Sequence, residues 1–292
     1  MREPAHAQLA RTFISANGVD TNTCARTAPC RTLQVAHNKT TAGGEINMLD
    51  PAGYGTVTIT KSISIVNDGV GSAGILVPLS GVGITINAGD SDKINLRGLI
   101  IEGAGVGLDG IFTTSGASLT IENCVIRNLT NVGIQYAPAV ASTLSVSSTF
   151  FADIGGIGIN VSPSGTGAVK AVLSHIEVHN SGGAGVQIYG GISTGTLDAT
   201  VADSVSTDNQ YGLWVQTALS QAVTNVMVAR SAFANNSVTG ITVLGIGATL
   251  RLSRSTVTGN ANGWIGPVQS YGDNYINGNA SNESAPTSTP KK

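Results

Sequence analysis

One short pattern recurs along most of the chain. Six segments share alternating apolar residues, a small residue, Asn or Asp, and then a glycine followed by a second apolar pair. That glycine recurs every 23 to 28 residues, at Gly133, Gly158, Gly185, Gly212, Gly240 and Gly263, and Gly110 marks an earlier copy. The period matches leucine-rich repeats too, but their leucine-and-asparagine spacing is missing. Short alternating strands at this period, without a helical stretch, indicate the coils of a parallel β-solenoid.

The composition agrees with this architecture. The 292 residues include 38 glycines, and charged residues make up only 11% where about a quarter is usual. This mix suits short β-branched strands joined by frequent turns. A net charge of −2 gives no basic face for nucleic acid. No apolar run approaches the roughly 20 residues that a membrane-spanning helix needs.

Stacking of the coils places equivalent residues in columns about 4.8 Å apart. The inward small position holds Cys124, Thr149, Ile176, Ser204, Ser231 and Ser255, so Cys124 is expected to be a buried small residue rather than a nucleophile. A second column holds Asn128, Asp153, Asn180, Asp208 and Asn235. We expect it to lie at a turn, where these side chains bond the backbone of adjacent coils.

The repeats place one domain at residues 12–279, with a cap at about 12–45. Residues 32–39 form the best candidate for a short amphipathic helix that covers the first coil. Ala5-His6-Ala7 matches the end of a secretory signal, so residues 1–11 are predicted to be a signal-peptide remnant; an ordinary polar terminus is the alternative. Residues 280–292 are polar, contain proline and are predicted to be disordered.

Two cysteines bracket a polar loop near the N-terminus. Cys24 and Cys30 can form a local disulfide, which fits a secreted protein. A zinc site is less well supported, because five intervening residues match no common zinc spacing. We therefore expect no metal at these cysteines.

The N-terminal stretch "FISANGVDTNTCARTAPCRTLQVAH" and the following "AGGEINMLDPAGYGTVTITKSISI" carry a Gly-x-Asp turn, a Pro-x-x-Thr-Leu-Gln helix start and a Gly-Tyr pair. The residues concerned are Gly18, Asp20, Pro29, Thr32, Leu33, Gln34, Gly53 and Tyr54. This opening resembles that of secreted bacterial right-handed parallel β-helix proteins of the pectin-lyase-like superfamily. Together with the repeats, the resemblance covers residues 12–279. It implies an all-β, single-stranded right-handed parallel β-helix that is secreted, periplasmic or at the cell surface.

The resemblance leaves the activity open, because the superfamily includes lyases, hydrolases, epimerases and adhesins. Galacturonan hydrolases are expected to carry Asn-x-Asp, Asp-Asp and Gly-His-Gly motifs, and none of these occurs here. The calcium-binding carboxylates beside a basic residue that are expected of pectate lyases are not recognisable either. We expect no cofactor, and whether the protein is an enzyme stays undecided.

One group of residues is a candidate for catalysis. In "SHIEVHN", alternation along a strand predicts that His175, Glu177 and His179 share one face. Alignment of the coils predicts a row of residues that face outward at a bend, just before the inward small position: Gly98, Asn123, Ser148, His175, Asp203, Arg230 and Arg254. The catalytic hypothesis rests on four residues: His175, Asp203, Arg230 and Glu177. The histidine and the two carboxylates provide a base that would abstract a sugar proton, while the arginine neutralises the carboxylate of a uronate. The alternative is a surface ion pair beside exposed histidines; a metal site would lack a fourth ligand.

A second row suggests binding. It consists of Phe112, Gln135, Asn160, Gln187, Trp214 and Thr242, with Tyr189 and Tyr211 nearby. Amides flanked by aromatic rings suit sugars, whose hydroxyls need donors and acceptors and whose ring faces stack on aromatic side chains. The alternative is that the amides stack along the solenoid and Trp214 covers a loop.

The sequence therefore supports two functional hypotheses. The first is an exported protein that binds an extracellular polysaccharide or cell-surface glycan, with or without acting on it. The second is a non-enzymatic structural or adhesive surface solenoid. The longest insertions, "GGISTGTLD" after Tyr189 and "QTALSQAVTN" after Val215, are the candidates for a wall beside a binding groove. The oligomeric state is left open.

Overall fold

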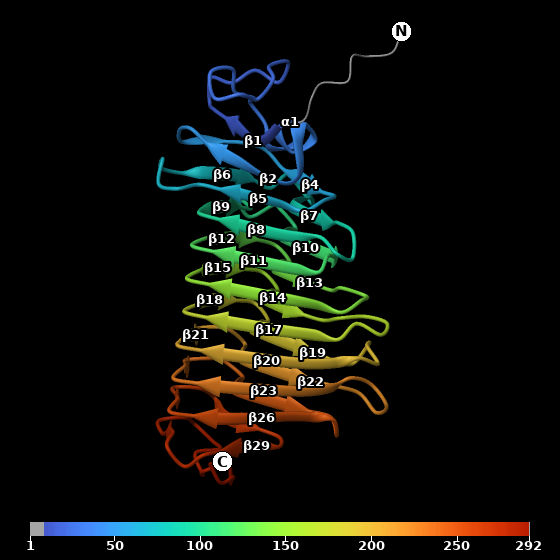
Figure 1. Cartoon of the computed structure of the whole chain (residues 1–292). Helices are drawn as coiled ribbons and strands as arrows, with labels where there is room; N and C mark the ends of the chain where they lie inside the picture. Colours follow the sequence, from blue (N-terminus) through green and yellow to red (C-terminus); the bar gives the residue numbers. More distant parts are fainter. Residues whose placement is uncertain (1–8, 292) are drawn as a thin grey trace.

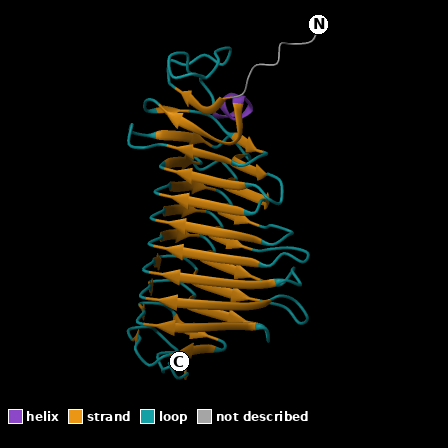
Figure 2. Cartoon of the chain, viewed as in Figure 1, coloured by secondary structure: helices purple, strands orange, loops and turns teal. Residues whose placement is uncertain are grey.

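The computed structural model describes residues 9–291 and shows three long parallel sheets wound around one axis (Figures 1 and 2). In each coil the chain passes from sheet I through sheet II to sheet III and then returns to sheet I one level along the axis. Within the described residues the sheets contain 12, 10 and 9 strands respectively, which gives about ten coils. The predicted parallel β-solenoid is confirmed.

The bounds of the strands follow the repeat. Sheet I consists of β1 (Leu9–Ile14), β2 (Thr40–Met48), β5 (Ile63–Val66), β8 (Lys93–Arg97), β11 (Ser118–Glu122), β14 (Ser142–Ser147), β17 (Val169–Ser174), β20 (Thr196–Ala202), β23 (Val223–Ala229), β26 (Ala248–Ser253), β29 (Val268–Ser270) and β31 (Thr287–Ser288). Sheet II consists of β3 (Ala52–Gly53), β6 (Ala73–Leu76), β9 (Leu99–Glu102), β12 (Val125–Leu129), β15 (Phe150–Ile154), β18 (Glu177–Ser181), β21 (Val205–Thr207), β24 (Ala232–Ala234), β27 (Thr256–Thr258) and β30 (Tyr275–Ile276). Sheet III consists of β4 (Val57–Ile59), β7 (Val82–Asn87), β10 (Asp109–Ser115), β13 (Val132–Tyr136), β16 (Ile157–Val161), β19 (Ala184–Tyr189), β22 (Tyr211–Gln216), β25 (Thr239–Leu244) and β28 (Asn262–Ile265).

The corner between sheets I and II has a fixed backbone conformation. One residue per coil turns the chain with a positive φ between +47° and +72°, at Gly98, Asn123, Ser148, His175, Asp203, Arg230 and Arg254. The coils are in register there, since the His175 N–H donates to the Ala202 carbonyl at 3.1 Å and the Asp203 N–H to the Ala229 carbonyl at 3.1 Å. The row aligned from the sequence is therefore a physical column at an outward corner.

The next residue in each coil points inward, as predicted, and in the C-terminal half it forms a hydroxyl ladder. The Ser204 N–H donates to the Ser231 hydroxyl at 3.2 Å, and the Ser231 N–H donates to the Ser255 hydroxyl at 3.2 Å. These hydrogen bonds satisfy buried amide groups that the corner withdraws from the strand pairing. Cys124 occupies the same column and is buried, and burial raises the pKa of its thiol to about 11. The thiol therefore stays protonated at neutral pH, which disfavours a nucleophilic role.

The corner between sheets II and III carries a second ladder, one residue later than the sequence indicated. The column that includes Asn180 and Asn235 has positive φ and points outward, and Asn180 Nδ2 donates to the Asp153 carboxylate at 2.6 Å rather than to backbone. The prediction of backbone bonding by that column is therefore wrong. The buried residue that follows makes these bonds instead, in a column formed by Asn209, Asn236, Asn260 and Asn279.

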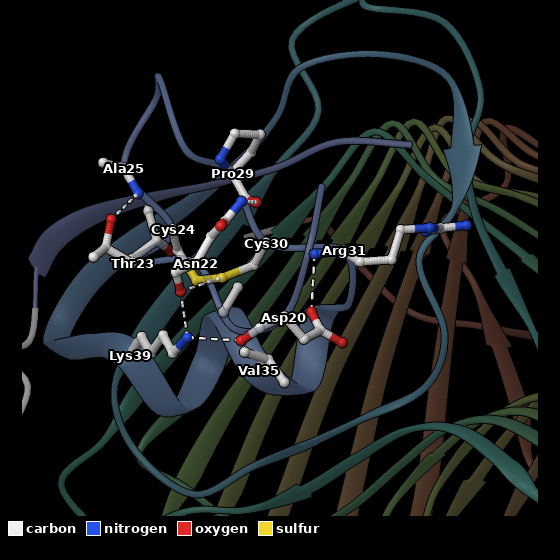
Figure 3. Close-up of a disulfide and its surroundings, with 12 residues drawn as sticks. Asp20, Asn22, Thr23, Cys24, Ala25, Pro29, Cys30, Arg31, Val35 and Lys39 are labelled. Atoms are coloured by element: carbon white, nitrogen blue, oxygen red, sulfur yellow. Dashed lines mark hydrogen bonds between the residues drawn. A yellow bond between two sulfur atoms is a disulfide. The ribbon is translucent and has the colours of Figure 1, made fainter. Parts of the chain in front are cut away.

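The first coil is covered by α1 (Leu33–Lys39), as predicted. Thr32 is its N-cap, and the Asp20 carboxylate accepts the N–H groups of Arg31 and Thr32 at 2.9 Å each. At the other end of the helix, Lys39 Nζ donates to the Asp20 carbonyl at 2.8 Å (Figure 3). Leu33 and Ala36 pack into the core, so the helix closes an apolar interior that would otherwise be open to water.

A disulfide joins Cys24 and Cys30, as predicted, with their Cα atoms 4.7 Å apart (Figure 3). The disulfide fixes the loop that precedes the cap helix. Lys39 of that helix donates hydrogen bonds to two backbone carbonyls of the same loop region, those of Asp20 and Asn22. Both cysteines are fully buried.

Replacement of both cysteines by serine is expected to lower the free energy of unfolding of the cap by about 2 kcal/mol, because a short loop regains its freedom in the unfolded state. Thermal unfolding followed by circular dichroism, with and without reductant, measures the effect. Reductant should destabilise the wild-type chain and leave the double variant unchanged. Equal sensitivity of both proteins to reductant would contradict the prediction.

The boundaries predicted for the two ends of the chain have different outcomes. Ala5-His6-Ala7 lies outside the described residues, and β1 begins at Leu9. At the C-terminus the sequence predicts a disordered tail over 280–292, whereas the structure places residues 280–291 against the last coil. There β31 pairs with β29, and Lys291 Nζ lies 2.9 Å from the Asp273 carboxylate.

Candidate functional site

The outer face of sheet III carries the row of amide and aromatic residues found in the sequence. Strand pairing places them one above another, and we call this row the amide–aromatic strip: Phe112, Gln135, Asn160, Gln187, Trp214 and Thr242. Each of these residues stands between two inward neighbours, as Gln135 stands between the buried Ile134 and Tyr136. The strip therefore follows directly from the alternation along each strand.

The middle of the strip is hollowed into a depression of about 460 Å³, which we call the strip depression. It brings together four residues that the sequence singled out, Asn160, Gln187, Tyr189 and Trp214. It adds three that the sequence reading missed, Ser162, Ile192 and Gln216. Ser162 and Ile192 belong to loops after β16 and β19, so only the packing of adjacent coils brings them to the strip. Phe112, Gln135 and Tyr211 do not line the depression.

Polar groups in the strip depression are only partly used by the protein itself. Asn160 Nδ2 donates to Gln135 Oε1 at 2.8 Å, and Gln135 Nε2 donates to Ser162 Oγ at 2.7 Å. Within residues 9–291, however, Asn160 Oδ1 and Trp214 Nε1 are buried without a hydrogen-bond partner.

The amides of Gln187 and Gln216 make no side-chain hydrogen bond within the described part of the chain. Gln187 pairs with Trp214 from the preceding coil on β19, and Gln216 lies two residues beyond Trp214 on β22. The depression therefore offers free donors and acceptors beside an indole ring. This is a combination that a polyhydroxylated ligand can use.

The aromatic rings are held in place by their neighbours. The ring centroids of Tyr211 and Trp214 lie 4.4 Å apart with an interplanar angle of 57°, so Tyr211 supports the indole from the start of the same strand. Tyr189 lies against the backbone of Gly191, where an added Cβ would fall 2.6 Å from the phenol ring. Such contacts restrict the rings and lower the entropy that a ligand would lose on binding.

His175, Glu177 and His179 do not lie on one strand, because His175 stands at the bend that the aligned row predicts. β17 ends at Ser174, His175 turns the corner with a φ of +52°, and β18 begins at Glu177. The prediction that His175, Glu177 and His179 lie on one strand face is therefore wrong. From His175 to His179 outward and inward residues alternate, which is why this stretch reads as a strand, but Ser174 and His175 both face outward and mark the corner.

At this corner the structure brings Asp203 and Arg230 into a two-pronged ion pair. Arg230 Nε and Nη2 each donate to one Asp203 carboxylate oxygen, at 2.6 Å. This hydrogen bonding, together with the positive charges of Arg230 and His175, lowers the pKa of the Asp203 carboxyl. Asp203 is consequently a weak base, and the guanidinium is already occupied by a carboxylate.

Glu177 and His179 lie apart from this pair, on β18. His179 Nε2 is 3.4 Å from a Glu177 carboxylate oxygen, and its ring centroid lies 5.3 Å from that of Phe150. Of the four candidate catalytic residues, Asp203 and Arg230 thus form one pair, whereas Glu177 is paired with His179. Within residues 9–291, no group of three or more His, Cys, Asp or Glu side chains is arranged to hold a metal ion.

A larger depression, about 1020 Å³, lies on the outer face of sheet I near the C-terminal end. We call it the sheet I groove. Its charged lining residues are Lys170, Asp198, Arg251, Arg254 and Lys291. The sequence reading did not identify it, because these residues come from coils whose outward positions share no residue type.

A comparison with known families decides the classification. Residues 54–202 and 110–281 match the family described as the right-handed β-helix region, and the two matches together span most of the chain. The chain belongs to this family. The predicted right-handed parallel β-helix is thereby confirmed, and a comparison with curated protein sequences gave no match.

Solved structures with the same fold extend this result. Pectate lyase Pel9A superposes on this β-helix with a TM-score of 0.67 at 14% identity, over 97% of this chain and 78% of the lyase. A rhamnogalacturonan lyase gives 0.62 at 14% identity, over 86% and 75% of the two chains. The A-module of mannuronan C-5 epimerase AlgE4 from Azotobacter vinelandii gives 0.55 at 14% identity, over 86% and 91%. Each is named for a polysaccharide on which it acts, and at this identity the likeness shows the fold alone.

The part of the chain that the structure describes contains no helix long and apolar enough to cross a bilayer.

Proposed function

We propose that this β-helix is an exported protein that binds an extracellular polysaccharide along the amide–aromatic strip. The observation that carries the proposal is the strip depression, where the free amides of Gln187 and Gln216 stand beside the indole ring of Trp214. Sugar hydroxyls would form hydrogen bonds with these amides, and a sugar ring face would pack on the indole.

Export is supported by the disulfide. Cys24–Cys30 links the first loop of the domain, and stable disulfides are typical of oxidising compartments outside the cytosol. A long, regular face also suits an extracellular polysaccharide. The strip presents one residue per coil, so it can contact successive sugar units of a chain. The three solved structures with this fold are named for polysaccharides, which agrees with such a ligand.

The position of the candidate catalytic residues favours binding over turnover at this site. His175, Asp203 and Arg230 stand at the corner between sheets I and II, whereas the strip runs along sheet III. A sugar in the strip depression would not face them. Catalysis by His175, Glu177, Asp203 and Arg230 thus remains a separate proposal. The second candidate function is that of a non-enzymatic adhesive solenoid. The occupied Arg230 guanidinium favours that candidate.

The proposal predicts that Trp214→Ala and Gln187→Ala weaken polysaccharide binding. We expect Trp214→Ala to lower the affinity about tenfold or more, because a buried aromatic residue at a binding site often contributes above 1.4 kcal/mol. A glycan-array screen with the intact chain would first identify a ligand, and titration calorimetry would then compare the variants.

Phe150→Ala is the matched control, since it removes a partly exposed aromatic ring from sheet II and leaves the strip intact. It should bind as the wild type does. Circular dichroism must show that all variants are folded. The proposal fails if no polysaccharide binds, or if Phe150→Ala loses as much affinity as Trp214→Ala.

A further inference from the structure

The cap helix contacts the first strand of sheet III at an edge that no other strand covers. Within residues 9–291, β4 pairs with β7 alone, and α1 lies against its other side (Figure 1). Two side chains of the helix take the place of a neighbouring strand there. Gln34 Oε1 accepts the Thr58 N–H at 2.8 Å, and His37 Nε2 accepts the Thr60 N–H at 3.2 Å.

This arrangement follows from the geometry of both elements. Gln34 and His37 stand three residues apart in α1, so they share one face of the helix. Thr58 and Thr60 are alternate residues, and the N–H groups of alternate residues in an extended chain point to the same edge. The helix therefore satisfies two successive donors of the strand edge.

The hydrogen bond to Thr60 fixes the protonation state of His37. A backbone N–H can only donate, so Nε2 must keep its lone pair and the ring proton must lie on Nδ1. From there it donates to Asn38 Oδ1, at 3.3 Å. His37 is only 3% exposed, so water cannot replace these partners while the cap is closed. The closed cap thus requires a neutral imidazole.

The charged groups around His37 do not favour its protonated form. Lys61 follows β4, and its ammonium group donates to the backbone carbonyl at the end of α1. The other strands that contact the helix are β1 and β2, whose charged residues Arg11 and Glu45 pair with each other at 2.9 Å. Lys39 of the helix itself is bonded to the loop that precedes it. Among the described residues, no carboxylate forms an ion pair with His37.

The pKa of His37 is consistent with this geometry. Burial lowers it below the ordinary histidine value, the hydrogen bond to Asn38 opposes that effect, and the charge of Lys61 lowers it further. The stability that the neutral ring gives the cap is therefore complete above the ordinary histidine pKa. It is lost as the pH falls below that value towards the pKa in the folded protein.

From these observations we propose that His37 makes the N-terminal cap a pH-sensitive switch, in which protonation of the ring releases α1 from β4. A proton on Nε2 would face the Thr60 N–H, donor against donor, and would bury a charge beside Lys61. Release of the helix would bare the edge of sheet III, and an unpaired strand edge is a template for the addition of another strand. This goes beyond the proposed function, because it concerns the cap and does not depend on the strip.

The test is amide hydrogen exchange of the intact chain, measured by NMR at about pH 7.5 and about pH 5 and corrected for intrinsic exchange. The lower pH stays above the range in which ordinary carboxyls become protonated. We expect the protection of the Thr58 and Thr60 amides to fall about tenfold or more at the lower pH, because opening becomes linked to proton uptake. The amide of Ile159, in the middle of sheet III, should keep its protection.

His37→Gln is the variant that separates hydrogen bonding from charge. Its amide oxygen can accept the Thr60 N–H, as Gln34 does for Thr58, but it does not titrate. In this variant the protection of both threonine amides should not change between the two pH values. His179→Gln is the matched control, because it removes a partly exposed histidine from sheet II and should keep the pH dependence of the wild type. Circular dichroism at the higher pH must show that both variants are folded.

Two results would overturn the proposal: unchanged protection of Thr60 in the wild type at the lower pH, or the same fall in His37→Gln as in the wild type. If His37→Gln does not fold, the wild type alone still decides. The NMR titration of the His37 ring should then share its midpoint with the loss of Thr60 protection. Protonation of the ring while Thr60 stays protected would show that the cap holds a charged imidazole without opening.

Discussion

Asn236→Ala is expected to lower the free energy of unfolding by about 3 to 4 kcal/mol, because it breaks the buried asparagine ladder. Asn236 Oδ1 accepts from the Asn209 N–H at 3.1 Å and from Asn209 Nδ2 at 3.2 Å, and Asn236 Nδ2 donates to Asn260 Oδ1 at 2.9 Å. In the alanine variant, the backbone N–H and the Nδ2 group of Asn209 lose the hydrogen bonds that Asn236 Oδ1 accepts. A buried donor that loses its partner lowers the free energy of unfolding by roughly 1 to 3 kcal/mol.

Urea unfolding followed by circular dichroism measures this effect. Asn235→Gly is the control on the same turn: Asn235 is exposed with a φ of +54°, which glycine adopts freely, and glycine already occupies the equivalent place in the next coil at Gly259. That variant should stay within about 0.5 kcal/mol of the wild type. Similar midpoints for Asn236→Ala and the wild type would show that the ladder contributes little.

Gly158→Ala is the second change with a large expected effect, about 2 to 3 kcal/mol of lost stability. A Cβ at this position would lie 2.5 Å from Val178 Cγ1 and 2.6 Å from the Gly185 carbonyl oxygen of the next coil. The carbonyl belongs to a paired strand, so neither the methyl group nor the backbone can move away cheaply. The glycine that marks the repeat is therefore required by the close approach of adjacent coils.

Gly53→Ala is the comparison for this prediction, because an added Cβ there meets no atom within 4 Å and the φ of Gly53 is not positive. Denaturant midpoints of the two variants should differ clearly, with Gly53→Ala close to the wild type. A Gly158→Ala protein as stable as Gly53→Ala would mean that the coils can separate locally to admit a methyl group.

The strip shows how far a repeat can predict a surface. Asn160, Gln187 and Trp214 align in the sequence because each follows the repeat glycine by the same number of residues, and a parallel solenoid converts that spacing into vertical stacking. Which of their polar atoms lack partners depends on side-chain packing between coils. Ser162 enters the strip depression from a loop of variable length, where the repeat carries no information.

The sequence by itself determined the coil period, the inward and outward residues, the capping helix and the Cys24–Cys30 pairing, because these depend on local spacing and on the alternation along strands. Only the tertiary structure decided the left-handed backbone conformation of His175, the column of buried asparagines and the sheet I groove. Residues 175–179 alternate as a strand does, and the corner shows only as two successive outward residues, Ser174 and His175. The groove needs the C-terminal segment and several coils together, and their side chains meet only when the solenoid is wound.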